Sequence, residues 1–471
     1  MFFSRKTQLI ILLLGDLVLF YIGLLATLTI RYLSLPGAAA WDDHKWPFFY
    51  VHLVWIIVFY SAGLYDLKSL ASAKIIFRKI IHTITVSFLI AISMFYLIPF
   101  FRITPKTNLF IDAALVAILL FGWRRIFWIL TSKANKIKIL FFGFSKEIEE
   151  LVSYLKIHLQ IGYEPKIILT PPEKELNESQ PTKQDPKNGE KLIRLPLNHN
   201  LISLIKKYDI QLIVASKSMI QDKEGAKRFY EVLPLGISIM DFPSFYEIIM
   251  GKIPVSLINE SWFLENLMEI NKKTFEFFKR ISDIIAAVAL GIPTLMIYPL
   301  ISGAIKAGSK GPALIRQERT GKNGKIFKII KFRSMITLSS DGLAEKNGAV
   351  WSKKEDNRIT AVGKFIRKTR IDELPQLWNV LKGEMSFIGP RPERPEFVKE
   401  LENKIPHYSM RHIVRPGLSG WAQINLPYGA SFEYTMEKIQ YDLFYIKNRS
   451  FTLEIAIALK TIAAMIRREG R

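Results

Sequence analysis

Long apolar runs constrain this chain more than any other feature of its sequence. Four of them fall in the first 131 residues, at roughly 8–30, 47–65, 80–101 and 108–123. Each approaches the ~20 residues that an α-helix needs to cross the hydrocarbon core of a bilayer. The first run is longer than the apolar part of a signal peptide, and no small-residue cleavage site follows it. The pattern therefore predicts a bundle of four transmembrane helices over residues 1–131.

Basic residues are unevenly distributed over the segments that join these runs. They gather before the first run, between the second and third, and after the fourth, whereas the other two segments carry less net positive charge. The residues of the enriched segments are Arg5, Lys6, Lys68, Lys74, Arg78, Lys79, Arg124, Arg125, Lys133, Lys136 and Lys138. Because basic loops stay on the cytoplasmic side, we expect the N-terminus and everything after the fourth helix to be cytoplasmic.

One acidic residue, Asp16, lies inside the first apolar run. An acid at the centre of a bilayer costs ~2.5–3.5 kcal/mol on insertion scales, so its side chain is expected to face other helices. Two interpretations remain open for Asp16, a functional role and a satisfied packing contact.

Residues 132–270 alternate between short apolar strands and amphipathic segments. Strand patterns occur at 137–143, 166–170, 210–215 and 236–240, a helical stretch occupies about 145–158, and the polar segment 171–190 is expected to be an exposed loop. This alternation predicts a doubly wound, Rossmann-like cytosolic α/β domain. Its first turn, Phe142-Gly-Phe-Ser145, lacks the glycine fingerprint of dinucleotide sites, which favours a regulatory or structural role.

A fifth apolar run, at about 284–305, has basic residues on both sides and is interrupted by Pro293 and Pro299. Each proline removes a backbone donor and favours a kink. A re-entrant hairpin over about 281–305, which enters and leaves the membrane by one face, fits both observations. The alternative is a fifth spanning helix, which would place the C-terminal third outside the cell. We therefore expect an α+β monotopic catalytic domain over residues 271–471, with a re-entrant membrane helix.

The net charge and the absence of cysteine limit the reactions and the binding partners that are possible for this chain. The formal net charge is +23 and the chain contains no cysteine, so disulfides, thiolate catalysis and thiolate-bound zinc are excluded. A strongly basic chain fits nucleic acid, an anionic membrane surface or phosphorylated substrates. Together with the apolar runs, the charge favours a membrane protein over a nucleic-acid-binding protein.

The segment 317–335 gathers cations around glycines that permit tight turns, and the alternation of Ile326, Ile329 and Phe332 predicts a strand. Its basic residues are Arg319, Lys322, Lys325, Lys328, Lys331 and Arg333. Such a face can contact anionic lipid, or it can bind a diphosphate.

Asp372 and Glu373 begin a predicted short helix that ends at Gly383. Acids are common at this end of a helix because they favour its dipole, so the pair alone does not indicate a site. However, Arg367 and Arg370 lie just upstream. Two adjacent carboxylates among arginines are suited to phosphoryl transfer, one to attack and one to hold a hard cation such as Mg²⁺.

The segment from about 275 to 465 resembles the bacterial sugar transferase family, the polyprenyl-phosphate hexose-1-phosphate transferases with a monotopic catalytic core. The matching segments are Lys279-Arg280 with Asp283, Lys306 with Gly311-Pro312, Gln317, Arg319 and Gly321, Lys331-Phe-Arg-Ser-Met335, Asp372-Glu-Leu-Pro-Gln376, Gly383, Gly389-Pro-Arg-Pro392, Arg415-Pro-Gly417, Gly420-Trp-Ala-Gln423, and Tyr441-Asp-Leu443 with Tyr445. The N-terminal helices and the α/β domain are similar to those of the long members. The prolines depart from the short members, which have one Ser-Pro break where Leu295-Met296 stands here.

The resemblance implies roles for individual residues. Asp372 would be the nucleophile that attacks the β-phosphate of a UDP-sugar and expels UMP, and Glu373 would bind Mg²⁺. Arg367 would hold the phosphate, and the Pro390-Arg391-Pro392 loop would contact the nucleotide. The further substrate-binding residues that it implies are Arg370, Arg319, Lys331, Arg333, Arg415 and Gln423.

The implied reaction moves a hexose 1-phosphate from a UDP-sugar, with glucose or galactose expected from the family, to undecaprenyl phosphate. It would be the first membrane step of exopolysaccharide, capsule or O-antigen assembly. The enzyme would be a multi-pass protein of the bacterial inner membrane with a cytoplasmic catalytic domain, would contact lipid but no nucleic acid, and would form a homo-oligomer (dimer).

Two rival functions belong to other classes. In the first, the chain is a membrane-anchored scaffold or regulator whose basic core binds anionic lipid, and release of UMP from a UDP-sugar would distinguish it from the transferase. In the second, it is an NAD-dependent membrane enzyme built on the α/β domain, against which the missing glycine fingerprint counts. For the C-terminal stretch 451–468, attachment to the membrane surface and packing against the catalytic core are equal alternatives.

Overall fold

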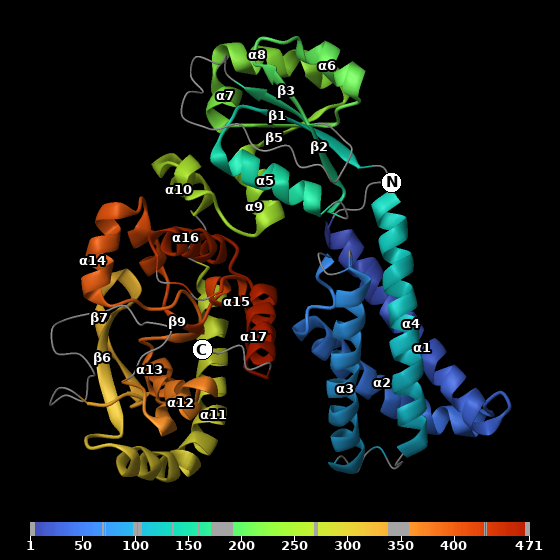
Figure 1. Ribbon diagram of the computed structural model, residues 1–471, viewed down its shortest axis with the longest axis vertical. Helices are drawn as coiled ribbons and strands as arrows, with labels where there is room; N and C mark the ends of the chain where they lie inside the picture. Colours follow the sequence, from blue (N-terminus) through green and yellow to red (C-terminus); the bar gives the residue numbers. More distant parts are fainter. Residues whose placement is uncertain are drawn as a thin grey trace. The chain divides into compact units, whose positions relative to one another are not determined.

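The protein forms two compact units, Met1–Phe245 and Tyr246–Arg471. The computed structural model describes residues 5–67, 70, 72–97, 101, 106–133, 136–158, 161–170, 192–267, 272–337, 358–427, 429 and 431–466. The first unit contains the N-terminal helices and most of the predicted α/β domain, and the second contains Asp372 and Glu373 (Figure 1).

The four predicted N-terminal helices are present. They are α1 (Arg5–Tyr32), α2 (Ala38–Ser61), α3 (Ala73–Leu97) and α4 (Lys106–Lys133). They share a core in which Phe20, Trp55 and Phe59 are almost fully buried. Among the described residues, α1, α3 and α4 are long and apolar enough to cross a membrane, and so is α11 (Lys273–Gly308) of the second unit. Helix α2 is not among them, and its first turns carry Asp42, Asp43, His44 and Lys45.

Asp16 of α1 has a buried partner on α4. The Arg124 guanidinium donates to both carboxylate oxygens of Asp16, at 2.6 and 2.7 Å, and neither side chain has any exposed surface. The Tyr65 hydroxyl also donates to the carboxylate, at 2.8 Å. These contacts match the packing interpretation of Asp16, because the carboxylate is neutralised and hydrogen-bonded inside the bundle.

The α/β segment contains a parallel five-stranded sheet in the order β3-β2-β1-β4-β5. Its strands are β1 (Ile137–Phe142), β2 (Tyr163–Thr170), β3 (Ile193–Pro196), β4 (Leu212–Ala215) and β5 (Ser238–Asp241). The four predicted strands correspond to β1, β2, β4 and β5, whereas β3 was not predicted because its side chains alternate in burial over only four residues. The predicted loop 171–190 lies outside the described residues.

Helices lie on both faces of this sheet. One face packs against α6 (Leu201–Tyr208) and α8 (Lys223–Val232), and the other face contacts α9 (Phe242–Met250) through the rings of Phe141 and Phe245. Figure 1 shows α5 (Lys146–Ile157) on the same side as α9, and α7 (Lys217–Gln221) with α6 and α8. The turn that follows β1 caps helix α5, because the Ser145 hydroxyl accepts a hydrogen bond from the Ile148 amide.

The second unit surrounds α11 with short strands and helices. In chain order they are η6 (Val255–Leu257), α10 (Glu260–Asn266), α11, β6 (Leu314–Thr320), η8 (Lys322–Gly324), β7 (Ile326–Phe332), α12 (Ala361–Lys368), η9 (Ile371–Gln376), α13 (Leu377–Lys382), β8 (Ser386–Ile388), α14 (Pro395–Lys404), η10 (Tyr408–Ile413), β9 (Gly417–Ser419), α15 (Trp421–Asn425), α16 (Phe432–Lys447) and α17 (Phe451–Ile466). Strands β6 and β7 form an antiparallel hairpin, and β8 and β9 form a parallel pair. The predicted strand around Ile329 is confirmed as β7.

Helix α11 is bent, and both of its ends contact other elements of the second unit. It contains Pro293 and Pro299, and Figure 1 shows its second part running in a different direction from its first. Near the start of α11, Lys279 pairs with Glu454, and at its end the Arg333 guanidinium donates to the Ser309 carbonyl at 2.8 Å. If α11 were straight, its 36 residues would place its two ends about 54 Å apart.

Candidate active site

Asp372 and Glu373 lie in the first turn of η9, which continues directly into α13. The predicted helix is therefore present, but its first part is a 3-10 helix, and Gly383 ends it with a positive φ of 84° as expected. Arg370 enters η9 in the left-handed region, with φ 59°. Such a conformation costs of order 1–3 kcal/mol for a residue with a side chain and is found preferentially at functional sites.

Glu373 is a half-buried carboxylate neutralised by three cations. Its Oε1 accepts a hydrogen bond from Arg391 at 2.8 Å and lies 3.4 Å from Lys331 Nζ and 3.8 Å from Arg370 Nη1. Burial alone would raise the pKa of Glu373, but the charges of Arg391 and Lys331 outweigh burial and hold it well below its usual range. Glu373 is therefore an anion at any physiological pH.

Asp372 has the opposite environment. Only 9% of its surface is exposed, and none of the described residues donates a hydrogen bond to its Oδ1. Burial and the neighbouring Glu373 raise the pKa of Asp372, against the effects of Lys331, Arg367 and Arg391. Two adjacent carboxylates whose pKa values are pushed apart are suited to different tasks. Asp372 has an uncommitted oxygen, whereas Glu373 organises the surrounding cations.

Lys331 is the cation of β7 that faces this pair. Burial lowers its pKa to about 8, because the opposing effect of Glu373 only partly offsets the loss of hydration. The ammonium group lies beside both carboxylates, so it can stabilise charge on a phosphate bound next to Asp372.

Hydrogen bonds to its backbone carbonyls hold the loop that carries Arg391 in place. Gly417 of β9 donates to the Pro390 carbonyl at 2.9 Å, and Arg411 donates to the Arg391 carbonyl at 2.8 Å. Arg411 is almost completely buried and pairs with Asp442 at 2.8 Å. The sequence did not indicate Arg411, because it stands in no recognisable motif and its partners Arg391 and Asp442 are 20 or more residues away. Asp442 belongs to the Tyr441-Asp-Leu443 match.

Gly417→Ala tests how much this packing matters. A Cβ atom at residue 417 would lie 2.1 Å from the Gly389 amide nitrogen, so β8 and β9 would have to separate. Overpacking of this kind costs about 1–3 kcal/mol, and we expect a lower midpoint of thermal unfolding in detergent. Gly236→Ala is unsuitable as a control because its φ is 72°, whereas Gly291→Ala adds a Cβ in open space within helix α11 and should not lower the midpoint. An unchanged midpoint for Gly417→Ala would show that the two strands can part freely.

Asp372 and Glu373, which we call the dyad, open into a cavity of about 1330 Å³ within the second unit. Most of the residues that the sequence predicted for substrate binding line it: Arg319, Lys331, Arg333, Arg367, Arg370, Arg391, Pro392 and Gln423. Further charged residues line it to which the sequence analysis gave no role in the site, among them Lys279, Glu393, Lys438 and Glu454. Glu393 forms an ion pair with Lys438. Burial of Glu393 would raise its pKa, but this cation holds the pKa down to about 2.

Three of the predicted residues are placed for other contacts. Arg333 holds the end of α11, because its guanidinium donates to the carbonyls of Lys310 and Ser309 at 2.6 and 2.8 Å. Pro390 and Arg415 are not among the cavity-lining residues, and Arg415 lies 3.9 Å from a carboxylate oxygen of Glu276 on α11. A substrate-binding role for Arg333, Pro390 and Arg415 stays a prediction.

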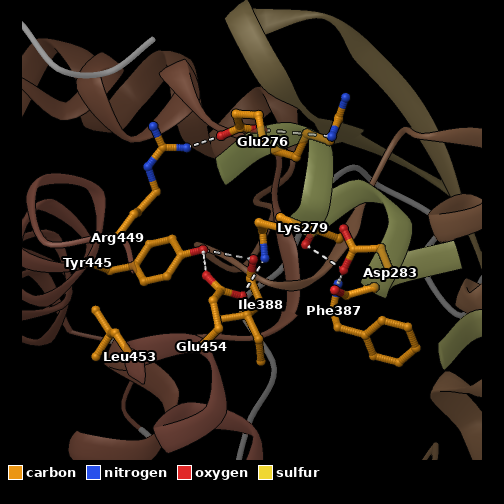
Figure 2. A network of polar contacts seen from close by, with 12 residues as sticks. Glu276, Lys279, Asp283, Phe387, Ile388, Tyr445, Arg449, Leu453 and Glu454 are labelled. Atoms are coloured by element: carbon orange, nitrogen blue, oxygen red, sulfur yellow. Dashed lines mark hydrogen bonds and ion pairs between the residues drawn. The ribbon is translucent and has the colours of Figure 1, made fainter. Parts of the chain in front are cut away.

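A polar network joins α11 to the strand that precedes the Arg391 loop. Figure 2 shows Lys279 and Asp283, one turn apart on α11, directed at Glu454 and at the backbone of β8. Asp283 accepts hydrogen bonds from the Phe387 amide and the Ser386 hydroxyl, at 3.1 and 3.0 Å. Beside it, the Tyr445 hydroxyl lies 2.6 Å from Glu454 Oε1. The membrane-compatible helix thus holds β8, and through it the loop that clamps Glu373.

Comparison with known proteins matches residues 274–468 to the family model "Bacterial sugar transferase". A UDP-N-acetylgalactosamine-undecaprenyl-phosphate N-acetylgalactosaminephosphotransferase of Aeromonas hydrophila is 44% identical over 221 residues, which are 47% of this chain and 50% of the relative. A UDP-glucose:undecaprenyl-phosphate glucose-1-phosphate transferase of Klebsiella pneumoniae is 41% identical over 187 residues, 39% of each chain. The match therefore spans half or less of these two curated relatives.

A shorter protein of Bacillus subtilis (strain 168) is matched over most of its length. It is named as a candidate undecaprenyl-phosphate N-acetylgalactosaminyl 1-phosphate transferase, and it is 48% identical over 147 residues, which are 30% of this chain and 78% of the relative. The residues matched by the family model include the dyad, the cationic strand β7 and the Arg391 loop. The chain belongs to the bacterial sugar transferase family.

Proposed function

We propose that this protein transfers a hexose 1-phosphate from a UDP-sugar to undecaprenyl phosphate and releases UMP. The observation that carries the proposal is the dyad, in which a buried Asp372, whose Oδ1 accepts no hydrogen bond from the described part of the chain, adjoins a Glu373 neutralised by Lys331 and Arg391. The names of the relatives support the substrate class but differ in the sugar, which is N-acetylgalactosamine in one and glucose in another.

In the proposed mechanism, an oxygen of Asp372 attacks the β-phosphorus of the UDP-sugar. The Asp–phosphorus bond forms, the bond to the bridging oxygen of the diphosphate breaks, and UMP leaves with the electron pair. An oxygen of undecaprenyl phosphate then attacks the same phosphorus and returns the Asp372 carboxylate. Lys331, Arg367 and Arg391 offset the repulsion between the anions.

A divalent cation fits this donor set. Mg²⁺ is commonly held by one or two carboxylates together with substrate phosphates and water, and Asp372 and Glu373 supply two carboxylates beside a cavity large enough for a diphosphate. Within the described part of the chain, no cluster of three or more His, Asp and Glu side chains could hold a metal alone. Glu373 is the residue that we propose to hold Mg²⁺, which would supply further charge neutralisation at the diphosphate.

Purified protein offered a panel of UDP-hexoses with undecaprenyl phosphate and Mg²⁺ tests the function. We expect release of UMP with at least one sugar, together with a lipid product that carries the hexose 1-phosphate. Absence of UMP with every sugar, from protein that is folded by thermal unfolding, would overturn the proposal and favour a scaffold.

We further propose that the catalytic unit is cytoplasmic, at a bacterial inner membrane, and that α11 is re-entrant. The bend of α11 and the contacts at both of its ends support re-entry. The chain has no cysteine, so single cysteines report topology directly. Cysteines at the exposed Lys273, the first residue of α11, and the exposed Lys322, beyond its end, should be labelled from the same face of the membrane, and a cysteine at the exposed Leu35 from the other. Labelling of 273 and 322 from opposite faces would identify α11 as a spanning helix.

A further inference from the structure

The cavity is larger than one polar substrate requires, and its lining has two chemical characters. Its volume of about 1330 Å³ exceeds the range of about 300–1,000 Å³ that is typical of small-molecule sites. One part carries the dyad and its cations, which suit a diphosphate. The other part is formed by apolar side chains of α11 and α17, for which a nucleotide sugar has no matching group.

One face of each helix lines this apolar part. Beyond Lys279 and Asp283, the α11 residues that line the cavity are Ser282, Ala286 and Leu290, which follow one another at intervals of four and so lie on a single face. On α17 the lining residues Ile455, Ala458, Ile462 and Met465 follow at intervals of three or four, which also defines a single face. Two helical faces therefore form the walls of an apolar cleft, which we call the α11–α17 cleft.

The α17 face is apolar without being covered by the described part of the unit. The opposite side of α17 packs into the core, where Ile457 is fully buried. On the cleft side, Ile455, Ile462 and Met465 are 59%, 53% and 48% exposed, and Leu290 of α11 is 49% exposed. Exposed apolar surface of this kind marks an interaction site, here next to a helix that is apolar enough to enter a membrane.

A buried ion pair ties the two walls together at the polar end of the cleft. Lys279 and Glu454 also line the cavity, just before the apolar lining residues of α11 and α17, and Figure 2 shows the two side chains directed at each other. The same cavity continues from this pair to Asp372, so a ligand with an apolar chain and a phosphate could satisfy both parts at once.

We infer that the α11–α17 cleft holds the first isoprene units of the polyprenyl phosphate acceptor, with its phosphate in the cationic part of the cavity. The inference rests on the proposed function and adds the place where the acceptor binds. Its support is the continuity of the cleft with the dyad, the match of apolar and cationic lining to the two ends of this lipid, and the access that a membrane helix gives from the bilayer.

Ala458→Trp and Ala286→Trp would fill the cleft from one wall or the other. We expect kcat/KM for undecaprenyl phosphate to fall about ten-fold or more, because the indole occupies the space of the chain. The kcat/KM for the UDP-sugar should stay unchanged, because the cations at the dyad are untouched. Thr452→Trp and Ile285→Trp are the matched controls, since they add the same bulk to the same helices at exposed positions that do not line the cavity.

Two results would overturn the inference. If both cleft variants keep wild-type kcat/KM for undecaprenyl phosphate, the cleft is empty during turnover. If they lower kcat/KM for both substrates equally, while the controls do not, the cleft serves the whole site and not the acceptor. Failure of the proposed function itself is a different result, because the wild-type protein would then release no UMP.

Discussion

Asp372→Asn is expected to abolish exchange of labelled UMP into UDP-sugar, a reaction that wild-type protein should catalyse without any lipid acceptor. If Asp372 forms a covalent phosphosugar, the first half-reaction is complete and reversible on its own. The variant keeps the size of the side chain but removes the anionic nucleophile, so we expect exchange to fall by a factor on the order of 10⁴ or more. The measurement is incorporation of radiolabelled UMP with Mg²⁺ present and polyprenyl phosphate absent.

The control for this variant is its neighbour. Glu373→Gln leaves Lys331 and Arg391 without their counter-charge but leaves the nucleophile in place. We expect weakened exchange that recovers in part at high Mg²⁺, whereas Asp372→Asn should not recover at any concentration while it still binds UDP-sugar. Exchange that requires lipid in the wild-type protein would contradict the covalent mechanism and leave the overall transfer intact.

The sequence predicted the parts of the fold whose patterns are local. The four helices, the strands β1, β2, β4, β5 and β7, and the helix that follows Asp372 correspond to runs of apolar periodicity bounded by turn residues. The short strand β3 escaped prediction because four residues of alternating burial carry too little signal. The 3-10 geometry of the first turn at Asp372, which follows Arg370 in the left-handed region, was also missed.

The site shows the same division between local and distant information. Adjacent carboxylates and nearby arginines are visible in the sequence, but the separate environments of Asp372 and Glu373 are not. They arise because Lys331 and Arg391, 42 and 18 residues away from Glu373, converge on its carboxylate. Arg333 illustrates the opposite case, since a basic residue in a cationic segment is used to hold the end of a helix.

Asp16→Leu is expected to destabilise the N-terminal bundle by about 3–5 kcal/mol. The change leaves Arg124 as a fully buried cation without its carboxylate, and removing one partner of a buried pair costs more than the pair contributes. The Tyr65 hydroxyl loses its acceptor as well. The measurement is the midpoint of thermal unfolding of the purified protein in detergent, followed through the tryptophans of the bundle.

The matched control removes the whole polar cluster, as Asp16→Leu with Arg124→Leu and Tyr65→Phe. Because the charges then disappear together, and apolar groups often replace a buried pair at little cost, we expect most of the lost stability to return. If sugar-phosphate transfer returns with stability, the pair serves packing, which is the interpretation that its closed set of contacts supports. If the triple variant is stable but transfer stays lost, Asp16 and Arg124 have a role that packing does not explain, and the functional interpretation of an acid inside the membrane is restored.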